Sequence, residues 1–395
     1  MAHDIGSAGA RGQPRHIVIA NPESRRWQFY HRDLQAYWAN RGVVPSIAVV
    51  PWELVVSQLG QLDGLSAFDL PGVVRLESPG RNINVARLLL AAGARTRGEP
   101  PEPWLNLPDR KGWLIEPALL HEGFCRVLSG LQTSFAARPW LRLEAEPRDL
   151  MAMFDKVETC RQFSAAGLPT PRLLASAVPW TPARLLEDLD ADARGQGTYY
   201  VKFRYGSSAA GIAMVHAGGG PGAHQATTSV LARGGEFFNT RRLRHVRGEE
   251  LHAVLRFILN QGACVQEGIR MAQIDGQNFD VRVVTLNARP AGTIFRLSSN
   301  PMTNLHLGGR RGDTDRCRSE IPRRLWLDAL DACAAAAAFY QTTMVGFDVL
   351  FERGYHRFFL LEANAFGDFV PDWVTPEGHS LHHLEIAATA ERFSL

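Results

Sequence analysis

The fold is decided by two apolar stretches, GFDVL at residues 346–350 and FLLEAN at residues 359–364. Each is typical of a buried strand, and each carries a carboxylate. Because side chains alternate along a strand, Glu362 and Asn364 share a face. If the two strands are neighbours, Asp348 joins them in a hard oxygen site that suits Mg²⁺ bridging phosphates. The alternative is a pair of surface carboxylates on a hairpin, but carboxylates in runs this apolar usually need a partner.

A lysine followed by small residues forms the second feature, YYVKFRYGSSAAGI at residues 199–212. Lys202 ends a strand, and the small side chains after it let backbone N–H groups approach phosphate oxygens. The lysine adds a point charge. The pattern differs from GxxxxGK[ST], so an ordinary glycine- and serine-rich hairpin loop is the alternative.

Two arginines on adjacent strands form the third feature. The stretch CVQEGI at residues 264–269 leads from a strand into a loop, and NFDVRVV follows at residues 278–284. Asp280 and Arg282 share one face of the second strand, and the next strand ends at Arg296. Two such guanidinium groups can hold a reacting carboxylate or a phosphoryl group in transfer. A cross-strand salt bridge on a solvated face is the alternative.

Two basic clusters lie elsewhere in the chain. They comprise Arg241, Arg242, Arg244, His245 and Arg247, and then Arg310, Arg311, Arg316, Arg318, Arg323 and Arg324. Either cluster could grip nucleotide phosphates or an acidic substrate, although a solvated face explains most of these residues. His379 and His383 are four residues apart, but no convincing metal arrangement surrounds them.

The composition is that of a globular protein, with 45% hydrophobic and 21% charged residues in a chain of 395. A net charge of +3 is too balanced for bulk nucleic-acid binding. Five scattered cysteines without a CxxC pair fit reduced thiols. We find no signal peptide and no apolar run of about 18 residues, so we expect a cytoplasmic protein with no membrane partner. Residues 1–14 are expected to be a disordered leader.

The N-terminal part alternates between strand and helix patterns. Apolar strands are predicted at 16–20, 47–50 and 73–76, with helices at 25–41 and 83–92, the second closed by Gly93. This order predicts an open α/β sheet. No GxGxxG follows the first strand, so a dinucleotide site is not expected there. Further helices are predicted near 117–130 and 149–166, and strands at 199–203, 212–216, 263–266, 279–286, 291–297, 345–351 and 357–362.

The order of these motifs along the chain is more informative than any one of them. It runs from Asp155-Lys156 at a helix start, through Lys202, the stretch 266–269 and Asp280-x-Arg282, to Asn304 before a Gly-Gly pair, Asp348 and Glu362-x-Asn364. Over about residues 145–370 this series resembles the ATP-grasp superfamily. It is most similar to the branch of ribosomal-protein glutamate ligases and glutathione synthetases.

The resemblance implies a role for each position. Lys156 and Lys202 would contact the ATP phosphates, and Gly206, Ser207, Ser208 and Gly211 belong to the phosphate loop. Gln266, Glu267, Gly268 and Ile269 would form the hinge along adenine, and Asp275 would bind the ribose. Asp348, Glu362 and Asn364 would hold magnesium, as two ions, with Mn²⁺ able to substitute. Arg282 would stabilise the acyl phosphate and the tetrahedral intermediate. Arg296 and Asn304 would lie near the γ-phosphate or the second metal ion, and Asp280 would lie near the substrate.

Two features depart from the family pattern. After Lys202 the family commonly has proline, whereas this chain has Phe203-Arg204-Tyr205, and the phosphate loop is richer in alanine than usual. The resemblance divides the chain into an α/β domain at 15–108, a helical linker and central subdomain at 109–265, and a C-terminal subdomain at 266–395. The expected fold class is therefore α/β, with an ATP-grasp fold preceded by an open α/β domain and an α+β C-terminal part.

The function that the resemblance implies is an ATP-dependent carboxylate–amine ligase that works through an acyl phosphate. The carboxylate substrate would be an amino acid, a peptide or a polypeptide, and the nucleophile would be an amine. The arginine-rich loops favour an acidic peptide or protein as the substrate. The chain could form a homodimer, and no nucleic-acid partner is expected. The alternatives are a phosphotransferase acting on a hydroxyl group and a nucleotide-binding scaffold without catalysis.

Overall fold

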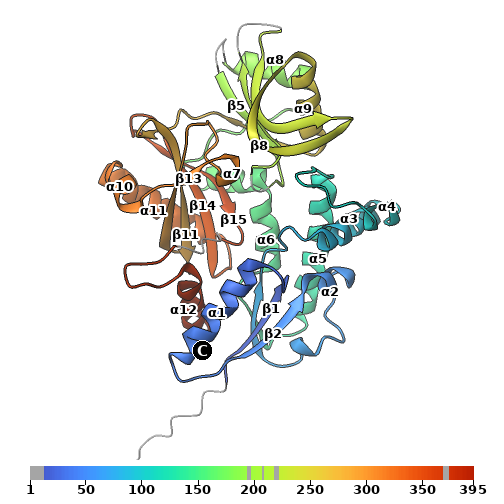
Figure 1. Ribbon diagram of the computed structural model, residues 1–395, viewed down its shortest axis with the longest axis vertical. Coiled ribbons are helices and arrows are strands. Elements are labelled where there is room, and N and C mark those ends of the chain that lie inside the picture. The colour runs from blue at the N-terminus through green and yellow to red at the C-terminus, as the bar shows by residue number, and fades with distance from the viewer. Residues whose placement is uncertain (1–12, 194–196, 207–208, 218–221, 368–372) are drawn as a thin grey trace, which may run out of the picture.

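Three β-sheets organise the computed structural model over the residues that it describes, which are 13–193, 197–206, 209–217, 222–367 and 373–395 (Figure 1). The first sheet is blue and lies at the bottom of Figure 1. The second sheet, green to yellow, lies at the top, and the third, brown to red, lies between them on the left. This mixed α/β architecture confirms the predicted fold class.

The first sheet is parallel, in the order β2-β1-β3-β4. Its strands are β1 (Arg15–Ala20), β2 (Ser46–Pro51), β3 (Gly72–Leu76) and β4 (Leu141–Leu143). The intervening helices are α1 (Arg25–Ala39), α2 (Trp52–Ser57), η1 (Ser66–Phe68), α3 (Ile83–Arg97), α4 (Glu102–Leu105) and α5 (Pro117–Ala136). Strand β1 is buried because its apolar run lies between two parallel neighbours, as the sequence predicts for an open α/β sheet.

The predicted end of helix α3 at Gly93 is wrong. The helix continues to Arg97 and ends at Gly98, whose φ of 73° is the left-handed conformation that favours glycine. Gly93 instead marks the place where α3 crosses α5. A Cβ atom there would lie 2.3 Å from the carbonyl oxygen of Leu119, so only glycine lets the two helices approach this closely.

The single helix predicted at 149–166 is two helices, α6 (Pro147–Phe154) and α7 (Lys156–Ala165). Asp155 separates them because its backbone is extended, with φ of −92° and ψ of 97°. Its carboxylate caps α7 by accepting hydrogen bonds from the backbone N–H groups of Val157 and Glu158. The break places Lys156 at the first position of the new helix.

The second sheet is antiparallel, in the order β8-β7-β6-β5-β9. Its elements are α8 (Pro182–Ala193), β5 (Gly197–Phe203), β6 (Ile212–Ala217), β7 (Gln225–Arg233), β8 (Glu236–Arg247), α9 (Gly248–Asn260) and β9 (Ala263–Glu267). The sequence did not reveal β7 and β8. Strand β8 lies at the sheet edge, where arginines replace the alternating apolar residues of an inner strand and discourage pairing with another chain.

The third sheet is also antiparallel, in the order β13-β12-β11-β14-β15, with β10 paired to β11. Its elements are β10 (Gln273–Ile274), β11 (Gln277–Leu286), β12 (Arg289–Ser298), η2 (Leu305–Leu307), β13 (Arg310–Arg311), α10 (Thr314–Ser319), α11 (Arg323–Ala337), β14 (Met344–Phe351) and β15 (Phe358–Asn364). One face of β11 places Phe279, Val281 and Val283 in the core. Alternation therefore turns Asp280 and Arg282 toward the opposite face.

A buried ion network joins the first sheet to the last helix, α12 (Leu381–Phe393). Arg75 on β3 contacts three buried carboxylates, those of Glu77, Glu144 and Glu385, the last of them on α12. Burial raises the pKa of Glu144 to about 7, because the charge of Arg75 only partly offsets the loss of hydration. Since removing one partner leaves a buried charge unpaired, the network couples α12 to the N-terminal sheet.

Buried His16 on β1 makes the stability of the fold depend on pH. Its Nε2 accepts a hydrogen bond from Trp38 Nε1 at 3.0 Å, and burial lowers its pKa to about 4. An unfolded histidine titrates near 6.5, so between pH 6.5 and 4 only the unfolded chain binds this proton, and lowering the pH favours unfolding. Relative to His16→Gln, we expect the unaltered chain to lose about 2 kcal/mol of unfolding free energy between pH 7.5 and 5.

Urea denaturation of both chains at the two pH values measures this difference. His356→Gln, at an exposed histidine, is the control for removing a histidine in general. If the difference in unfolding free energy between His16→Gln and the unaltered chain is the same at both pH values, His16 titrates alike in the folded and unfolded states.

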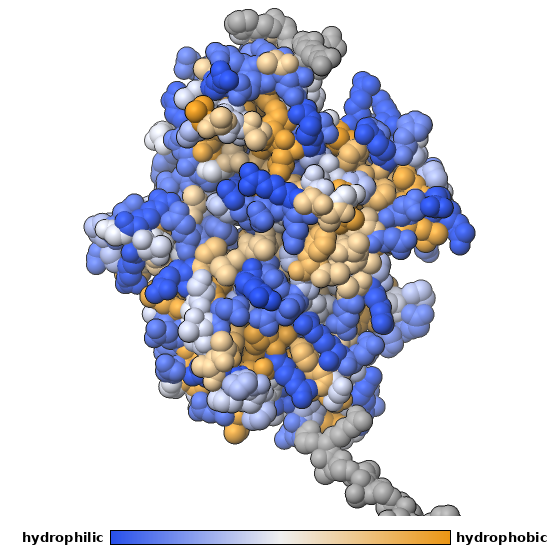
Figure 2. All heavy atoms as spheres, turned by 180° about the vertical axis from the view of Figure 1, so that it is seen from behind, coloured by the Kyte–Doolittle hydropathy of each residue, from blue (hydrophilic) through white to orange (hydrophobic). Residues whose placement is uncertain are grey.

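The described part of the chain contains no helix both long and apolar enough to cross a membrane. On the face seen in Figure 2, hydrophobic residues form separate patches among hydrophilic ones. The five cysteines are free thiols, as expected from their spacing.

Candidate functional site

The two deciding stretches pair as neighbouring antiparallel strands, with Asp348 on β14 directly opposite Glu362 on β15. The register shifts between Asp348 and Val349, because Leu361 is an extra residue on β15. Such a bulge re-aims side chains, and here Leu361 and Glu362 both line the same cavity although they are adjacent in sequence. Asn364 lies opposite Gly346, two residues further along the face.

Asp348 is held by both predicted arginines. Its Oδ1 lies 2.5 Å from Arg282 Nε, and its Oδ2 lies 2.9 Å from Arg296 Nη2. Arg296 also forms a two-pronged pair with Asp280, with distances of 2.8 and 2.5 Å. Burial alone would raise the pKa of Asp348, but the two guanidinium groups outweigh it and hold that pKa well below its ordinary value. Asp348 is therefore a carboxylate near neutral pH.

Gly346 makes room for Arg282. A Cβ atom at Gly346 would lie 3.1 Å from Arg282 Cδ and 2.9 Å from the carbonyl oxygen of Gly367. That carbonyl also accepts a hydrogen bond of 2.7 Å from Arg282 Nη1. The guanidinium group is thus fixed between Asp348 and the chain after β15, and Arg282 lines neither of the two cavities described below.

Lys156, at the start of α7, contacts Glu362 on β15 and the segment after β5. Its Nζ lies 3.0 Å from Glu362 Oε2 and donates to the carbonyl oxygen of Gly206 at 2.6 Å. Burial would lower the pKa of Lys156, but Glu362 outweighs it and raises the pKa above its ordinary value. A charged ammonium group therefore stands beside the β15 carboxylate.

The departure from the family pattern after Lys202 has a structural explanation. Arg204 forms a two-pronged pair with Asp155, with distances of 2.7 and 2.5 Å. Tyr205 stacks on His121 of α5, with ring centroids 3.8 Å apart. The two residues tie the end of β5 to the start of α7 and to α5, so Lys202 and Lys156 are held on one framework.

The predicted residues converge on a cavity of about 950 Å³, part of it open to solvent, between the second and third sheets. We call this the first cavity. Sequence-predicted residues in its wall are Lys156, Lys202, Gly206, Gln266, Glu267, Ile269, Asp280, Arg296, Asn304, Asp348 and Glu362. The side chain of Lys202 makes no hydrogen bond or ion pair with another described residue, and its ammonium group is thus available to a ligand.

The predicted hinge lies along one wall of the first cavity. Gln266 is buried and donates from Nε2 to Cys160 Sγ at 3.0 Å. Gly268 is absent from the wall, since its N–H donates to the carbonyl oxygen of Thr198 at 2.6 Å. Glycine is needed there because a Cβ atom would lie 2.7 Å from the same oxygen. The close contact fixes the path of the hinge.

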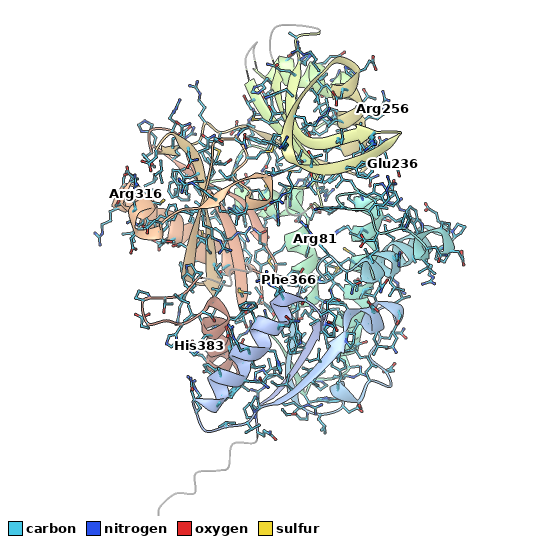
Figure 3. All side chains as sticks on the ribbon, in the orientation of Figure 1. Arg81, Glu236, Arg256, Arg316, Phe366 and His383 are labelled. Carbon is cyan, nitrogen blue, oxygen red and sulfur yellow. The ribbon has the colours of Figure 1, made fainter. Side chains whose placement is uncertain are left out.

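Asp275, the predicted ribose ligand, is not brought to the first cavity. It occupies the turn between β10 and β11 and pairs with Arg316 at 2.6 Å. Arg316 belongs to α10, and Figure 3 shows it at the outer edge of the molecule. Ser207 and Ser208, predicted in the phosphate loop, lie outside the described residues. No residue of either basic cluster lines the first cavity. Arg241, Arg242 and His245 line a separate groove.

Gly211 ends the predicted phosphate loop and lies against the ring of Phe203. Its φ is 62°, and a Cβ atom would lie 1.9 Å from Phe203 Cε2. We expect Gly211→Ala to weaken ATP binding about tenfold and to destabilise the fold by more than 1 kcal/mol, because it adds a clash to backbone strain. Gly234→Ala is the matched control, since Gly234 has φ of 60° but nothing within 4 Å. Nucleotide titration and urea denaturation of both variants measure the effects, and equal losses would contradict the steric explanation.

Sequence reasoning missed the apolar walls of the first cavity. Tyr200 and Met302 lie on its second-sheet and third-sheet sides, and Tyr200 donates from its hydroxyl to the carbonyl oxygen of Pro301 at 3.0 Å. The signal for Tyr200 was present, because it is two residues from Lys202 on the same strand face. Met302 gave no signal, since it lies in an irregular segment.

The residues present fit a magnesium ion by donor chemistry. Two carboxylates and an amide are the hard oxygen donors that Mg²⁺ takes, together with phosphate oxygens. No three His, Cys, Asp or Glu side chains of the described residues form a metal site, so the amide of Asn364 would be the third ligand. Its Nδ2 is buried and has no hydrogen-bond partner, and a rotation of the amide would place the oxygen there instead.

Solved structures of other proteins share the fold of this chain. Of solved structures, D-cycloserine synthetase DcsG is similar, with a TM-score of 0.54 and 12% identity over 96% of this chain and 99% of that one. The macrocyclase MdnC of Microcystis aeruginosa MRC, solved with its precursor peptide MdnA, has a TM-score of 0.52 and 11% identity over 97% and 99%. At these identities the likeness shows the fold alone.

No curated protein matches the sequence. A family model does match, and it spans residues 151–366, more than half of the chain. The matched region contains both lysines, the hinge, both arginines and the three candidate metal ligands. The chain belongs to the family of YheC/D-like ATP-grasp proteins.

Proposed function

We propose that this protein is an ATP-dependent ligase that joins a carboxylate to an amine through an acyl phosphate. The observation that carries the proposal is the position of Lys156 and Glu362, which line the first cavity and also a second one beside it. The end of a nucleotide bound in the first cavity would thus face a chamber for another substrate. The order of motifs also supports a relationship to the branch of ribosomal-protein glutamate ligases and glutathione synthetases.

ATP would lie in the first cavity with its adenine along Gln266, Glu267 and Ile269. Tyr200, Met302 and Leu361 supply apolar surface for the base, as in most small-molecule sites. Lys156 and Lys202 would meet the phosphates. Asp348, Glu362 and Asn364 would hold Mg²⁺, which supplies charge neutralisation at the phosphate oxygens when bound.

The first step is attack by a carboxylate oxygen of the substrate on the γ-phosphorus of ATP. A new P–O bond forms, the bond to the β–γ bridging oxygen breaks, and ADP leaves. The two reactants are both anions, so the lysines lower the barrier by offsetting their repulsion and holding the groups in line. The product is an acyl phosphate.

In the second step the amine nitrogen attacks the acyl carbon. The C–N bond forms, the carbon–phosphate oxygen bond breaks, inorganic phosphate leaves and the nitrogen loses a proton. The order of motifs assigns Arg282 to the negative charge that develops on the acyl oxygen. Because Arg282 lines neither cavity, its guanidinium group would have to leave the Gly367 carbonyl to reach that oxygen. Arg296 would hold Asp348 and Asp280 in place.

Product analysis tests the proposal. The protein is incubated with Mg-ATP and a panel of carboxylic acids and amines, and ADP, AMP and condensed products are separated. We expect substrate-dependent ADP and phosphate, together with an amide in the mass spectrum. AMP would contradict the chemistry, and a phosphorylated hydroxyl compound would identify a phosphotransferase instead. Omitting Mg²⁺ is the control for background hydrolysis.

A further inference from the structure

A second cavity of about 1460 Å³, again partly open to solvent, adjoins the first. It lies between the loop after β3, helices α3, α5 and α6, and the end of β15. Phe366, labelled in Figure 3, is in its wall, between the first and third sheets. The two cavities share Lys156, Phe203, Gly206, Ala210 and Glu362, so they adjoin, with the lysine and the carboxylate between them.

The wall of the second cavity is predominantly apolar. Helix α5 contributes Leu120 and Phe124, helix α6 contributes Phe154, and the segment before α5 contributes Trp113. Aromatic contacts fix part of this wall: the rings of Phe124 and Phe154 lie 5.3 Å apart, and those of Phe154 and Phe366 lie 6.0 Å apart. A ligand that entered would meet preformed apolar surface.

Charge is confined to the end that meets the first cavity. Among the described residues of the wall, only Lys156 and Glu362 are charged, and Asn364 adds an amide beside them. Burial lowers the pKa of His121 to about 4, so its ring is neutral near pH 7. An acidic side chain in the body of this cavity would lose its hydration and find no cation, which argues against the acidic substrate expected from the arginine-rich loops.

We infer that the second cavity binds the carboxylate substrate of the proposed ligase, and that this substrate has a bulky apolar body, either aromatic or aliphatic. The apolar body would lie against Leu120, Phe124 and Trp113. Its carboxylate would point to Lys156, where the nucleotide phosphates end. This inference rests on the proposed function for the role of the ligand, and on the wall chemistry for its class.

The experiment compares two acids of similar length, 3-phenylpropanoate and glutarate, with Mg-ATP and hydroxylamine as the amine. Hydroxylamine attacks the acyl phosphate, forms a hydroxamate and releases phosphate. We expect kcat/KM for ADP release and hydroxamate formation to be at least tenfold higher with 3-phenylpropanoate. Higher kcat/KM with glutarate would overturn the inference and leave the ligase proposal standing.

Variants locate the binding site. Leu120→Asp should lower kcat/KM for 3-phenylpropanoate at least tenfold while ATP affinity changes less than twofold, because Leu120 lines only the second cavity. Leu327→Asp, at an exposed leucine of α11, is the matched control. If Leu120→Asp does not fold, Leu120→Ser carries the same test. Unchanged kinetics in a folded Leu120 variant would place the apolar substrate elsewhere.

A direct binding measurement separates the two proposals. Tryptophan fluorescence is titrated with each acid in the presence of Mg-ADP, and Trp113→Phe shows which part of the signal comes from the second cavity. Saturable binding of 3-phenylpropanoate without any turnover would support the cavity assignment and count against the ligase. No Trp113-dependent signal with 3-phenylpropanoate would overturn the inference.

Discussion

Asp348→Asn is expected to lower the free energy of unfolding by about 3–5 kcal/mol and turnover by about 10³-fold. The substitution barely changes the shape of the side chain, but it removes the charge that Arg282 and Arg296 share. Among the described residues, Asp280 would remain as a carboxylate partner of Arg296. The stability loss follows from removing a carboxylate that two buried guanidinium groups share, and the loss of turnover follows from removing a candidate metal ligand.

Urea denaturation and ADP release measure the two effects. Asp328→Asn is the control, because Asp328 forms an exposed pair with Arg324 at 2.9 Å, and such a pair contributes about 0.5 kcal/mol or less. An Asp348→Asn protein as stable and as active as the unaltered chain would show that the buried pairs carry neither the fold nor the chemistry.

Arg282→Ala is expected to lower kcat by about 10²–10³-fold, the range for losing one donor that stabilises a developing oxyanion. ATP affinity should change little, since Arg282 does not line the first cavity. Rapid-quench measurement of ADP and amide in the same reaction locates the step affected. If ADP forms at the normal rate and the amide slowly, Arg282 acts on the second step.

The geometry also offers another way for Arg282 to act, through its 2.5 Å contact with Asp348. In that case Arg282 is a positioning residue, and Arg282→Ala should raise the Mg²⁺ concentration needed for half-maximal activity. Arg316→Ala removes an exposed arginine paired with Asp275 and should alter neither quantity. Normal turnover in Arg282→Ala would remove this residue from the mechanism altogether.

Much of this fold could be predicted because short-range signals decide it. Strands β14 and β15 are apolar runs broken only by Asp348, Glu362 and Asn364, and such runs have few other conformations open to them. Strand β8 was missed because it lies at an edge and carries charge on both faces. Gly93 was misinterpreted because a glycine that ends a helix and one that lets two helices touch look alike in sequence.

Part of the candidate site could also be predicted from local sequence, and part could not. Lys202, Asp280 and Arg282 follow from strand alternation, which is local. The bulge at Leu361 depends on the register with β14, and no residue pattern announces it. The apolar wall of the second cavity comes from α5 and α6, which reach the site only through tertiary packing, so Trp113 and Leu120 gave no sign of their position.

The contact of Arg75 with Glu385 has a consequence for the order in which the protein can be completed during synthesis. Arg75 leaves the ribosome more than 300 residues before Glu385, yet the buried site of Arg75 is finished only by α12. The first sheet can form early, but its ion network must wait for α12, so the nascent N-terminal part would remain open to proteases or chaperones until α12 has been synthesised. A chain truncated before α12 should therefore have an unstable first sheet, although the missing residues are far from that sheet in the sequence.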